Sequence, residues 1–241
     1  MNIQSRLIDY QHGDLALRAE LAVDADNTTP RPGILIAPNW AGRSPQDGLV
    51  ADRLAALGYA GFALDVYGAG VLGTSPEENA ANMQPLLDDR AELQARLLAA
   101  LATLQAQPEV DETRCAIIGY CFGGLCALDM ARCGAPVHGV VSFHGLFTPP
   151  ANLDVGRITS KILMLHGWDD PMATPDDVLA VSRELSAANA DWQLHAYGGV
   201  MHSFTSPAAD NPANGTGYDA IADQRSWQAT VHFLDELFAD S

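Results

Sequence analysis

The run Gly119-Tyr120-Cys121-Phe122-Gly123 places a cysteine between two glycines, directly after an apolar stretch and directly before a helical pattern. The stretch 115–118 is typical of a buried strand, and residues 122–133 have helical periodicity ended by Gly134. A chain passes from strand to helix this abruptly only through a sharp, strained turn, and flanking glycines leave room for neighbouring backbone. The pattern therefore predicts a strand–turn–helix unit in which the Cys121 side chain stands clear of a sheet.

A thiol at this position is suited to nucleophilic chemistry. The positive end of the helix dipole favours the thiolate, which is the reactive form. The alternative is a buried structural cysteine in a glycine-rich turn, and the residues described below favour the catalytic interpretation.

Apolar strands alternate with amphipathic helices along almost the whole chain. The run 33–37 is continuously apolar, as in a strand covered on both faces, whereas 15–23 alternates like an antiparallel edge strand. We therefore expect a single α/β domain over residues 1–241, with a mainly parallel central sheet and helices on both faces. The expected strands are 15–23, 33–37, 59–66, 114–119, 137–143, 161–166 and 192–197, and the expected helices are 47–57, one that begins at Ser75-Pro76, 86–105, 122–133, 175–189 and 218–238. The longest irregular stretches, 68–74, 145–159 and 206–216, all follow strands, where functional residues usually collect.

A nucleophilic thiol needs a base, and the base needs an orienting acid. The strand 161–166 leads into Asp169 and Asp170, and the strand 192–197 leads into a loop that contains His202. Cysteine, aspartate and histidine in this chain order, each following a strand, can converge at one edge of a parallel sheet. We expect Asp170 to be the acid because it precedes a proline in a tight turn, and Asp169 to be exposed.

The remaining motifs are weaker. His144 is a candidate pocket residue at the end of the strand 137–143, and His166 is expected to bond loop backbone. Residues 68–73 match GxGxxG, but the following helix begins only at Ser75-Pro76, so we expect a loop and not a dinucleotide site. No metal-binding spacing occurs, so no dedicated metal site is expected.

The net charge of the chain excludes some classes of binding partner. Lys and Arg number 13 against 30 Asp and Glu, a formal net charge of −17, which argues against nucleic acid or an anionic membrane. The start of the chain does not resemble a signal peptide, and no apolar run approaches the ~20 residues of a membrane span. All four cysteines lie within one predicted strand–turn–helix segment, from Cys115 to Cys133, so we expect reduced thiols and not a disulfide framework. Reduced thiols favour a cytoplasmic location. The oligomeric state is left open.

Taken with Asp170 and His202, residues 119–124, 165–171 and 202–204 resemble the dienelactone hydrolase family of α/β-hydrolases over nearly the whole chain. The resemblance implies hydrolysis of esters or lactones through a cysteine acyl-enzyme without a cofactor. It assigns Cys121 as nucleophile, His202 as base and then acid, and Asp170 as the group that orients His202. It places the oxyanion hole at the backbone N–H groups of Trp40 and Phe122.

Two positions depart from the family pattern. Asn39 stands where the namesake enzyme has an acid that helps to activate the thiol, so activation here falls to His202 and the helix dipole. Thr205 and Ser206 follow the His-Ser-Phe run, where the namesake has an arginine for a substrate carboxylate. Arg43 and Arg90 remain as other possible cations, or as members of surface ion pairs.

The sequence therefore predicts a cysteine-dependent hydrolase of a small neutral or weakly charged ester or lactone. The alternatives are an acyltransferase with the same triad, a non-catalytic α/β-hydrolase-like binding protein, and a redox sensor. The expected substrate pocket is lined by Asn39, Tyr67, His144, Trp168 and Phe204.

Overall fold

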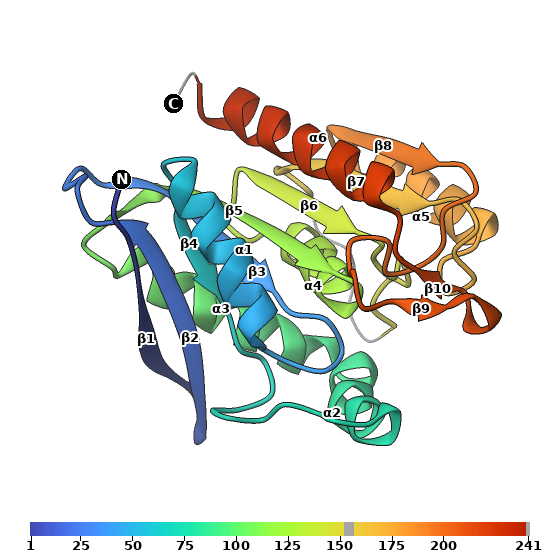
Figure 1. The fold of residues 1–241 in the computed structure, drawn as a ribbon, viewed down its shortest axis with the longest axis horizontal. Helices are drawn as coiled ribbons and strands as arrows, with labels where there is room; N and C mark the ends of the chain where they lie inside the picture. The colour runs from blue at the N-terminus through green and yellow to red at the C-terminus, as the bar shows by residue number, and fades with distance from the viewer. Residues whose placement is uncertain (152–156, 240–241) are drawn as a thin grey trace.

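The computed structural model describes residues 1–151 and 157–239. Within these residues, eight strands form one sheet in the order β1-β2-β4-β3-β5-β6-β7-β8 (Figure 1). Strand β2 pairs antiparallel with both of its neighbours, β1 and β4. All other neighbouring strands pair in parallel. The strands are β1 (Ile3–His12), β2 (Leu15–Asp24), β3 (Arg31–Ala37), β4 (Ala60–Ala63), β5 (Val110–Tyr120), β6 (Gly139–Phe143), β7 (Lys161–Gly167) and β8 (Trp192–Tyr197). The predicted mainly parallel α/β sheet is confirmed.

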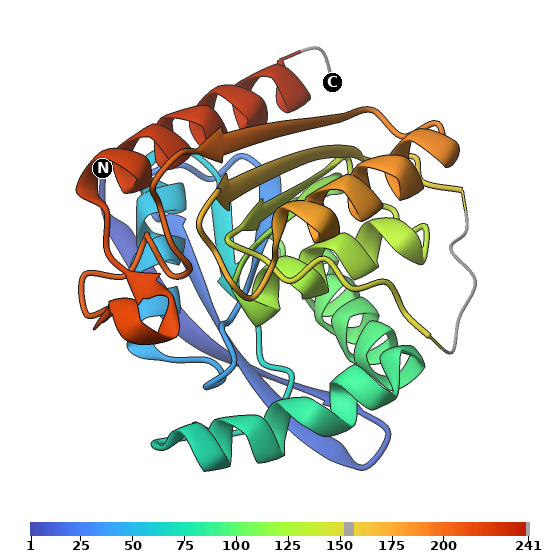
Figure 2. The same ribbon diagram turned by 90° about the vertical axis from the view of Figure 1, so that its right-hand side faces the viewer.

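Helices cover both faces of this sheet (Figure 2). Helices α1 (Pro45–Ala56) and α6 (Ala220–Phe238) lie on one face, and α3 (Arg90–Gln105), α4 (Phe122–Arg132) and α5 (Pro175–Ala187) lie on the other. Successive side chains of β3 show why: Ile34 and Ile36 belong to the core under α1 and α6, whereas Leu35 belongs to the core on the opposite face. A strand buried on both faces must be apolar throughout, as the run 33–37 is.

Three predicted elements differ from the structure. The strand expected over 59–66 is confined to the four residues of β4. The segment 15–23 is not an edge strand, because β1 pairs with β2 along its length, from Ile3 opposite Asp24 to His12 opposite Leu15. The helix expected over 86–105 is divided between α2 (Pro76–Asp88) and α3, because Asp89 has a non-helical backbone and caps α3 by accepting a hydrogen bond from the Glu92 N–H.

The glycine-rich stretch 68–73 is a loop, and α2 begins after it, with Ser75 accepting a hydrogen bond from the Glu78 N–H. The predicted irregular stretch 145–159 is only partly visible, since 152–156 lie outside the described residues. Two short strands, β9 (Asp210–Asn211) and β10 (Thr216–Gly217), flank the 3-10 turn η1 (Pro212–Asn214) in the stretch 206–216. No helix among the described residues is long and apolar enough to cross a membrane.

Candidate active site

Cys121 occupies the turn between β5 and α4 in a strained conformation, with φ 57° and ψ −117°. Such a backbone costs about 1–3 kcal/mol for a residue with a side chain. The flanking glycines are required by close packing: a Cβ on Gly119 would lie 2.0 Å from the Gly123 carbonyl oxygen, and one on Gly123 would lie 2.1 Å from the Ala37 carbonyl oxygen. The Cys121 side chain is only partly buried, so a small molecule can reach it.

His202 and Asp170 are held together by a buried hydrogen bond of 2.7 Å between Nδ1 and Oδ2. The other carboxylate oxygen of Asp170 accepts from the Met172 N–H at 2.8 Å, which fixes the carboxylate plane. Asp169 is exposed, as expected. The structure thus brings His202 and the second of the two aspartates together and leaves the first in solvent.

The second ring nitrogen of His202, Nε2, is buried and makes no hydrogen bond of ordinary geometry to the described residues. Cys121 nevertheless lies close enough to act on the charge of this ring. Burial by itself lowers the pKa of His202, but the hydrogen bond with Asp170 and the interaction with Cys121 outweigh it and raise the pKa to about 10. The imidazolium form is therefore favoured at neutral pH, beside a sulfur atom.

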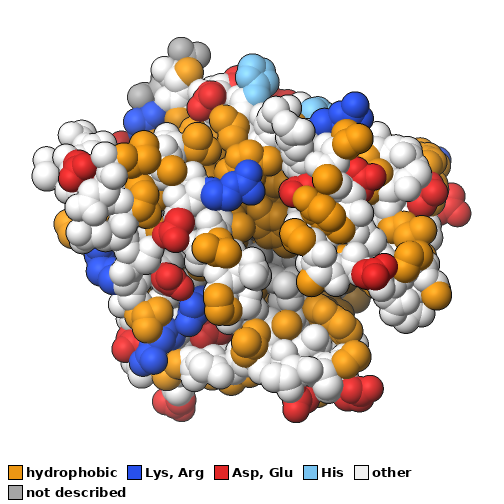
Figure 3. Space-filling model, viewed as in Figure 1, with side chains coloured by type: hydrophobic (Ala, Val, Ile, Leu, Met, Phe, Trp, Pro, Cys, Tyr) orange, Lys and Arg blue, Asp and Glu red, His pale blue; other side chains and the backbone are white. Residues whose placement is uncertain are grey.

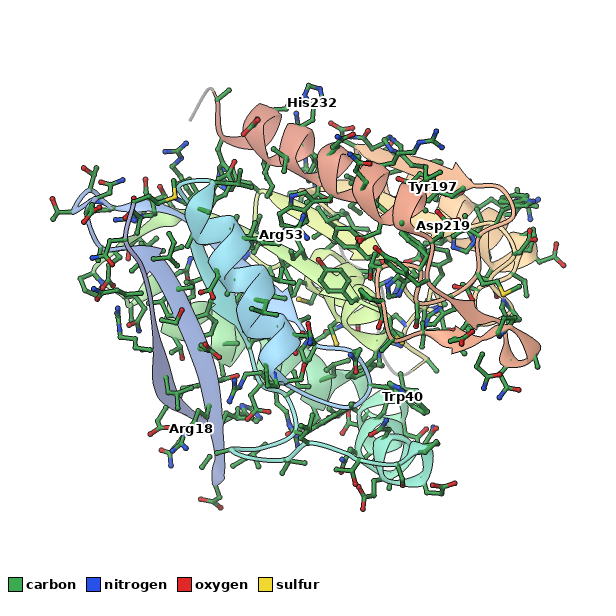
Figure 4. The ribbon with its side chains drawn as sticks, in the orientation of Figure 1. Arg18, Trp40, Arg53, Tyr197, Asp219 and His232 are labelled. Atoms are coloured by element: carbon green, nitrogen blue, oxygen red, sulfur yellow. The ribbon has the colours of Figure 1, made fainter. Side chains whose placement is uncertain are left out.

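The backbone N–H groups of Trp40 and Phe122 are available as donors, since neither has an acceptor among the described residues. Phe122 is the first residue of α4, where N–H groups lack intrahelical partners. Trp40 lies in the loop between β3 and α1 (Figure 4). Two unpaired donors on segments that flank Cys121 are suited to bind a developing oxyanion.

Tyr67 and Asn39 shape the loop that carries Trp40. The Tyr67 hydroxyl donates to the Trp40 carbonyl at 3.1 Å, and its ring stacks on Phe122 with the ring centres 6.0 Å apart. The Asn39 Oδ1 accepts from the Ala41 N–H at 2.8 Å, a turn that an aspartate would also make. Both residues therefore support the loop that carries Trp40, and Tyr67 also packs on the Phe122 ring.

The other predicted pocket residues differ in exposure. Trp168 is 43% exposed and accessible to a ligand, whereas Phe204 is fully buried and presents no surface to one. His144 is also buried: it shares a hydrogen bond of 2.8 Å with Thr205 and lies against the rings of His202 and Phe204. The sequence gives no sign of the Thr205 contact, which joins residues distant in the chain.

The expectation that His166 bonds loop backbone is wrong. Its ring is fully buried, and neither ring nitrogen has a partner among the described residues. It packs near the rings of Phe147 and Trp168. Burial is the main cause that lowers the pKa of His166, so the ring is neutral.

Neither candidate cation is available to a substrate carboxylate. Arg90 is buried and ion-paired with Asp129, so its salt bridge is not a surface one. Arg43 is hydrogen-bonded to the Arg18 carbonyl and to Glu20. In the part of the chain that the structure describes, no group of His, Cys, Asp or Glu side chains is arranged to hold a metal ion.

The space-filling view shows a hollow near the centre of one face, with hydrophobic side chains gathered around it, between α1 and the β9–β10 segment (Figure 3). The carboxyl end of β5 lies in the same part of the view (Figure 1). Two other surface cavities, of about 270 and 430 Å³, are lined by residues of the β1–β2 and α1 region and by none of the predicted site residues.

Known proteins resemble this chain over most of its length. The model of the dienelactone hydrolase family matches residues 17–238. A Bradyrhizobium protein named as a probable 2-oxo-3-(5-oxofuran-2-ylidene)propanoate lactonase is 28% identical over 220 residues, which cover 84% of this chain and 83% of the relative. An uncharacterised Caenorhabditis elegans protein, K02A2.1, is 39% identical over 155 residues, which cover 63% of this chain and 98% of the relative.

Among solved structures, a dienelactone hydrolase-like promiscuous phosphotriesterase from metagenomic libraries has a TM-score of 0.94 and 38% identity, covering 98% of this chain and 99% of its own. A protein called m3DLH has a TM-score of 0.94 and 39% identity, covering 99% of this chain and all of its own. With a family model that spans nearly the whole chain, the chain belongs to the dienelactone hydrolase family and is an ester or lactone hydrolase of that type.

Proposed function

We propose that this protein hydrolyses small neutral esters or lactones through an acyl-enzyme on Cys121, with His202 and Asp170 completing a triad. The observation that carries the proposal is the buried His202–Asp170 hydrogen bond beside a strained, accessible cysteine. We also propose that the protein is cytoplasmic, which its four free cysteines support, because thiols stay reduced in that compartment.

In the proposed reaction, the Cys121 thiolate attacks the carbonyl carbon of the substrate. The carbonyl oxygen becomes an oxyanion that accepts hydrogen bonds from the N–H groups of Trp40 and Phe122. The His202 imidazolium gives its Nε2 proton to the leaving oxygen, and the alcohol departs. The neutral imidazole then takes a proton from water, which attacks the acyl group and releases the acid and the thiolate.

The asparagine at position 39, where the namesake enzyme has an acid, is compatible with catalysis. Asn39 cannot carry a proton, but its side chain closes the turn from Asn39 to Ala41, which contains the proposed oxyanion donor Trp40. The raised pKa of His202 lets this histidine hold the proton that the thiol gives up. These two features favour an active enzyme over a non-catalytic binding protein.

A substrate panel tests the proposal. We expect turnover of neutral alkyl and aryl esters and of unsubstituted lactones. We expect at least about tenfold lower kcat/KM for matched substrates that carry a carboxylate, because Arg43 and Arg90 are both engaged in contacts within the protein. Intact-protein mass spectrometry should show an acyl adduct that maps to Cys121. Adding an alcohol acceptor separates hydrolysis from acyl transfer, and a dominant ester product would favour the transferase.

A second candidate activity is phosphotriester cleavage. A relative that is 38% identical across 98% of this chain is a promiscuous phosphotriesterase. The same Cys121 thiolate would attack phosphorus and displace one alkoxide or aryloxide, which leaves with the His202 proton, while the N–H donors hold the phosphoryl oxygen. Water activated by His202 would then release the phosphodiester and restore the thiolate. A neutral phosphotriester therefore belongs on the panel, with Cys121→Ser as the control.

The pH dependence follows from the raised pKa of His202. Because the pKa lies above the ordinary value of 6.5, the ring keeps its proton across neutral pH and loses it as the pH rises through about 10. We expect kcat/KM for an alkyl ester, whose leaving group needs that proton, to fall at the same pH. In Asp170→Asn the alkaline limb should move to lower pH and kcat/KM should drop by about a hundredfold.

Asp169→Asn is the matched control for this profile, since it makes the same change on the adjacent exposed residue. A p-nitrophenyl ester, whose leaving group needs no proton, should show a weaker alkaline limb. If the Asp170 and Asp169 variants have the same profile, Asp170 does not orient the base.

A further inference from the structure

The peptide unit between Phe143 and His144 joins the ends of two other strands. Its carbonyl, on Phe143, accepts a hydrogen bond from the Cys121 N–H at 3.0 Å. Its N–H, on His144, donates to the Leu165 carbonyl at 2.8 Å. Leu165 lies on β7, and the loop after β7 carries Asp170. The backbone at the end of β6 is therefore bonded to the elements that carry two members of the triad.

The side chain of His144 reaches the third element. Its Nε2 shares a hydrogen bond of 2.8 Å with the Thr205 hydroxyl, in the loop that follows His202. Its ring centre lies 5.1 Å from that of His202, with the planes at 68°, and 5.2 Å from that of Phe204. His144 thus fills the space beside the catalytic ring and is tied to its loop.

The backbone of His144 is strained for this purpose. Its φ of 36° is positive, a backbone conformation that is uncommon for residues other than glycine. Ser203, which follows His202, also has a positive φ, of 59°. Unfavourable backbone conformations of this kind are retained where the surrounding interactions impose them.

The charge state of His144 suits a place beside an imidazolium. Burial, and then the charge of His202, hold the pKa of His144 well below its usual range, so the ring stays neutral and does not repel its neighbour. The other groups that act on the charge of His202 are Asp170 and Cys121. His166, on β7, has a lowered pKa and is also neutral.

We propose that His144 is a positioning residue, which uses its hydrogen bond to Thr205 and its ring contact to hold the His202 ring between Cys121 and Asp170. The inference depends on the function proposed above. It predicts that the Thr205 hydroxyl matters for turnover, although its hydrogen bond is to His144 and not to a triad residue.

Thr205→Val and Thr205→Ser form a matched pair, because valine keeps the shape of threonine and serine keeps its hydroxyl. We expect Thr205→Val to lower kcat about tenfold with less than about a twofold change in KM, since a loosened base slows chemistry more than binding. The alkaline limb of the pH profile should move down by about half to one unit, because His202 is held less firmly against the groups that raise its pKa. Thr205→Ser should stay within about twofold of wild type in both respects.

The outcomes separate this inference from the proposed function. If Cys121→Ala is inactive but Thr205→Val matches Thr205→Ser in kcat and in pH profile, the positioning role is wrong and the triad stands. If Cys121→Ala keeps full activity, the triad itself is wrong. Should Thr205→Val not fold, Thr205→Ala removes the same hydroxyl without the extra methyl groups, and failure of both to fold would show a purely structural role and overturn the proposal.

Discussion

Replacing Cys121 by alanine should abolish ester hydrolysis, with kcat reduced by at least about 10⁴-fold. Alanine has the same Cβ as cysteine, so the strained turn at φ 57° gains no new contact and loses only the sulfur atom. The proposed oxyanion donors, the N–H groups of Trp40 and Phe122, remain and should account for any residual rate above that in water. Steady-state hydrolysis of an alkyl ester, with circular dichroism to verify the fold, measures the effect.

Cys133→Ala is the matched control, because this cysteine is also partly buried and lies at the opposite end of the same helix. It should keep wild-type activity. Cys121→Ser should lie between the two, since a hydroxyl ionises far less readily than a thiol and cannot form the same ion pair with His202. Wild-type turnover by Cys121→Ala would place the nucleophile elsewhere and end the acyl-enzyme mechanism.

The sequence was informative wherever function depends on local pattern. The strand–turn–helix around Cys121 follows from two glycines at fixed spacing, and the structure shows that a Cβ at either would meet backbone at about 2 Å. The adjacent aspartates could be distinguished because only Asp170 precedes a proline, and only it contacts His202 in the structure. Periodicity alone predicted the mainly parallel sheet with helices on both faces.

The sequence was uninformative wherever function depends on contacts between distant segments. No local pattern connects His144 with Thr205, or shows that Phe204 is buried behind them. Strand β1 was missed because most of its residues are exposed, so its hydrophobic pattern is weak. The break between α2 and α3 depends on Asp89, whose capping role is clear only once the backbone leaves the helix there.

A buried charge network supports the segment that follows His144. Asp129 is fully buried on α4 and accepts hydrogen bonds from Arg90, one of them at 2.6 Å, and from Arg132 at 3.4 Å. Both arginines also donate to the Thr148 carbonyl, at 3.2 and 3.3 Å, and Arg132 is bonded to Glu184. These contacts fix backbone that leads away from the site. Asp129 is the carboxylate that pairs with Arg90, whereas Arg132 pairs with both Asp129 and Glu184.

Asp129→Asn should therefore be among the most destabilising conservative substitutions in this chain. Asparagine keeps the size of the side chain but removes its charge, which leaves Arg90 buried without a counter-ion and Arg132 with Glu184 alone. Breaking one partner of a buried ion pair costs about 3–5 kcal/mol. For a domain of this size, that corresponds to a fall in Tm of about 6–20 °C. Calorimetry and urea unfolding of the wild type and the variant measure it.

Asp14→Asn is the control, because it makes the same chemical change in the exposed turn between β1 and β2. Its Tm should stay within about 1 °C of wild type, since an exposed charge contributes little. Near-wild-type stability of Asp129→Asn would mean that the two arginines reach solvent or other acceptors when the carboxylate is gone. In that case the carbonyl contacts at Phe147 and Thr148, and not the ion pairs, would be what holds this segment in place.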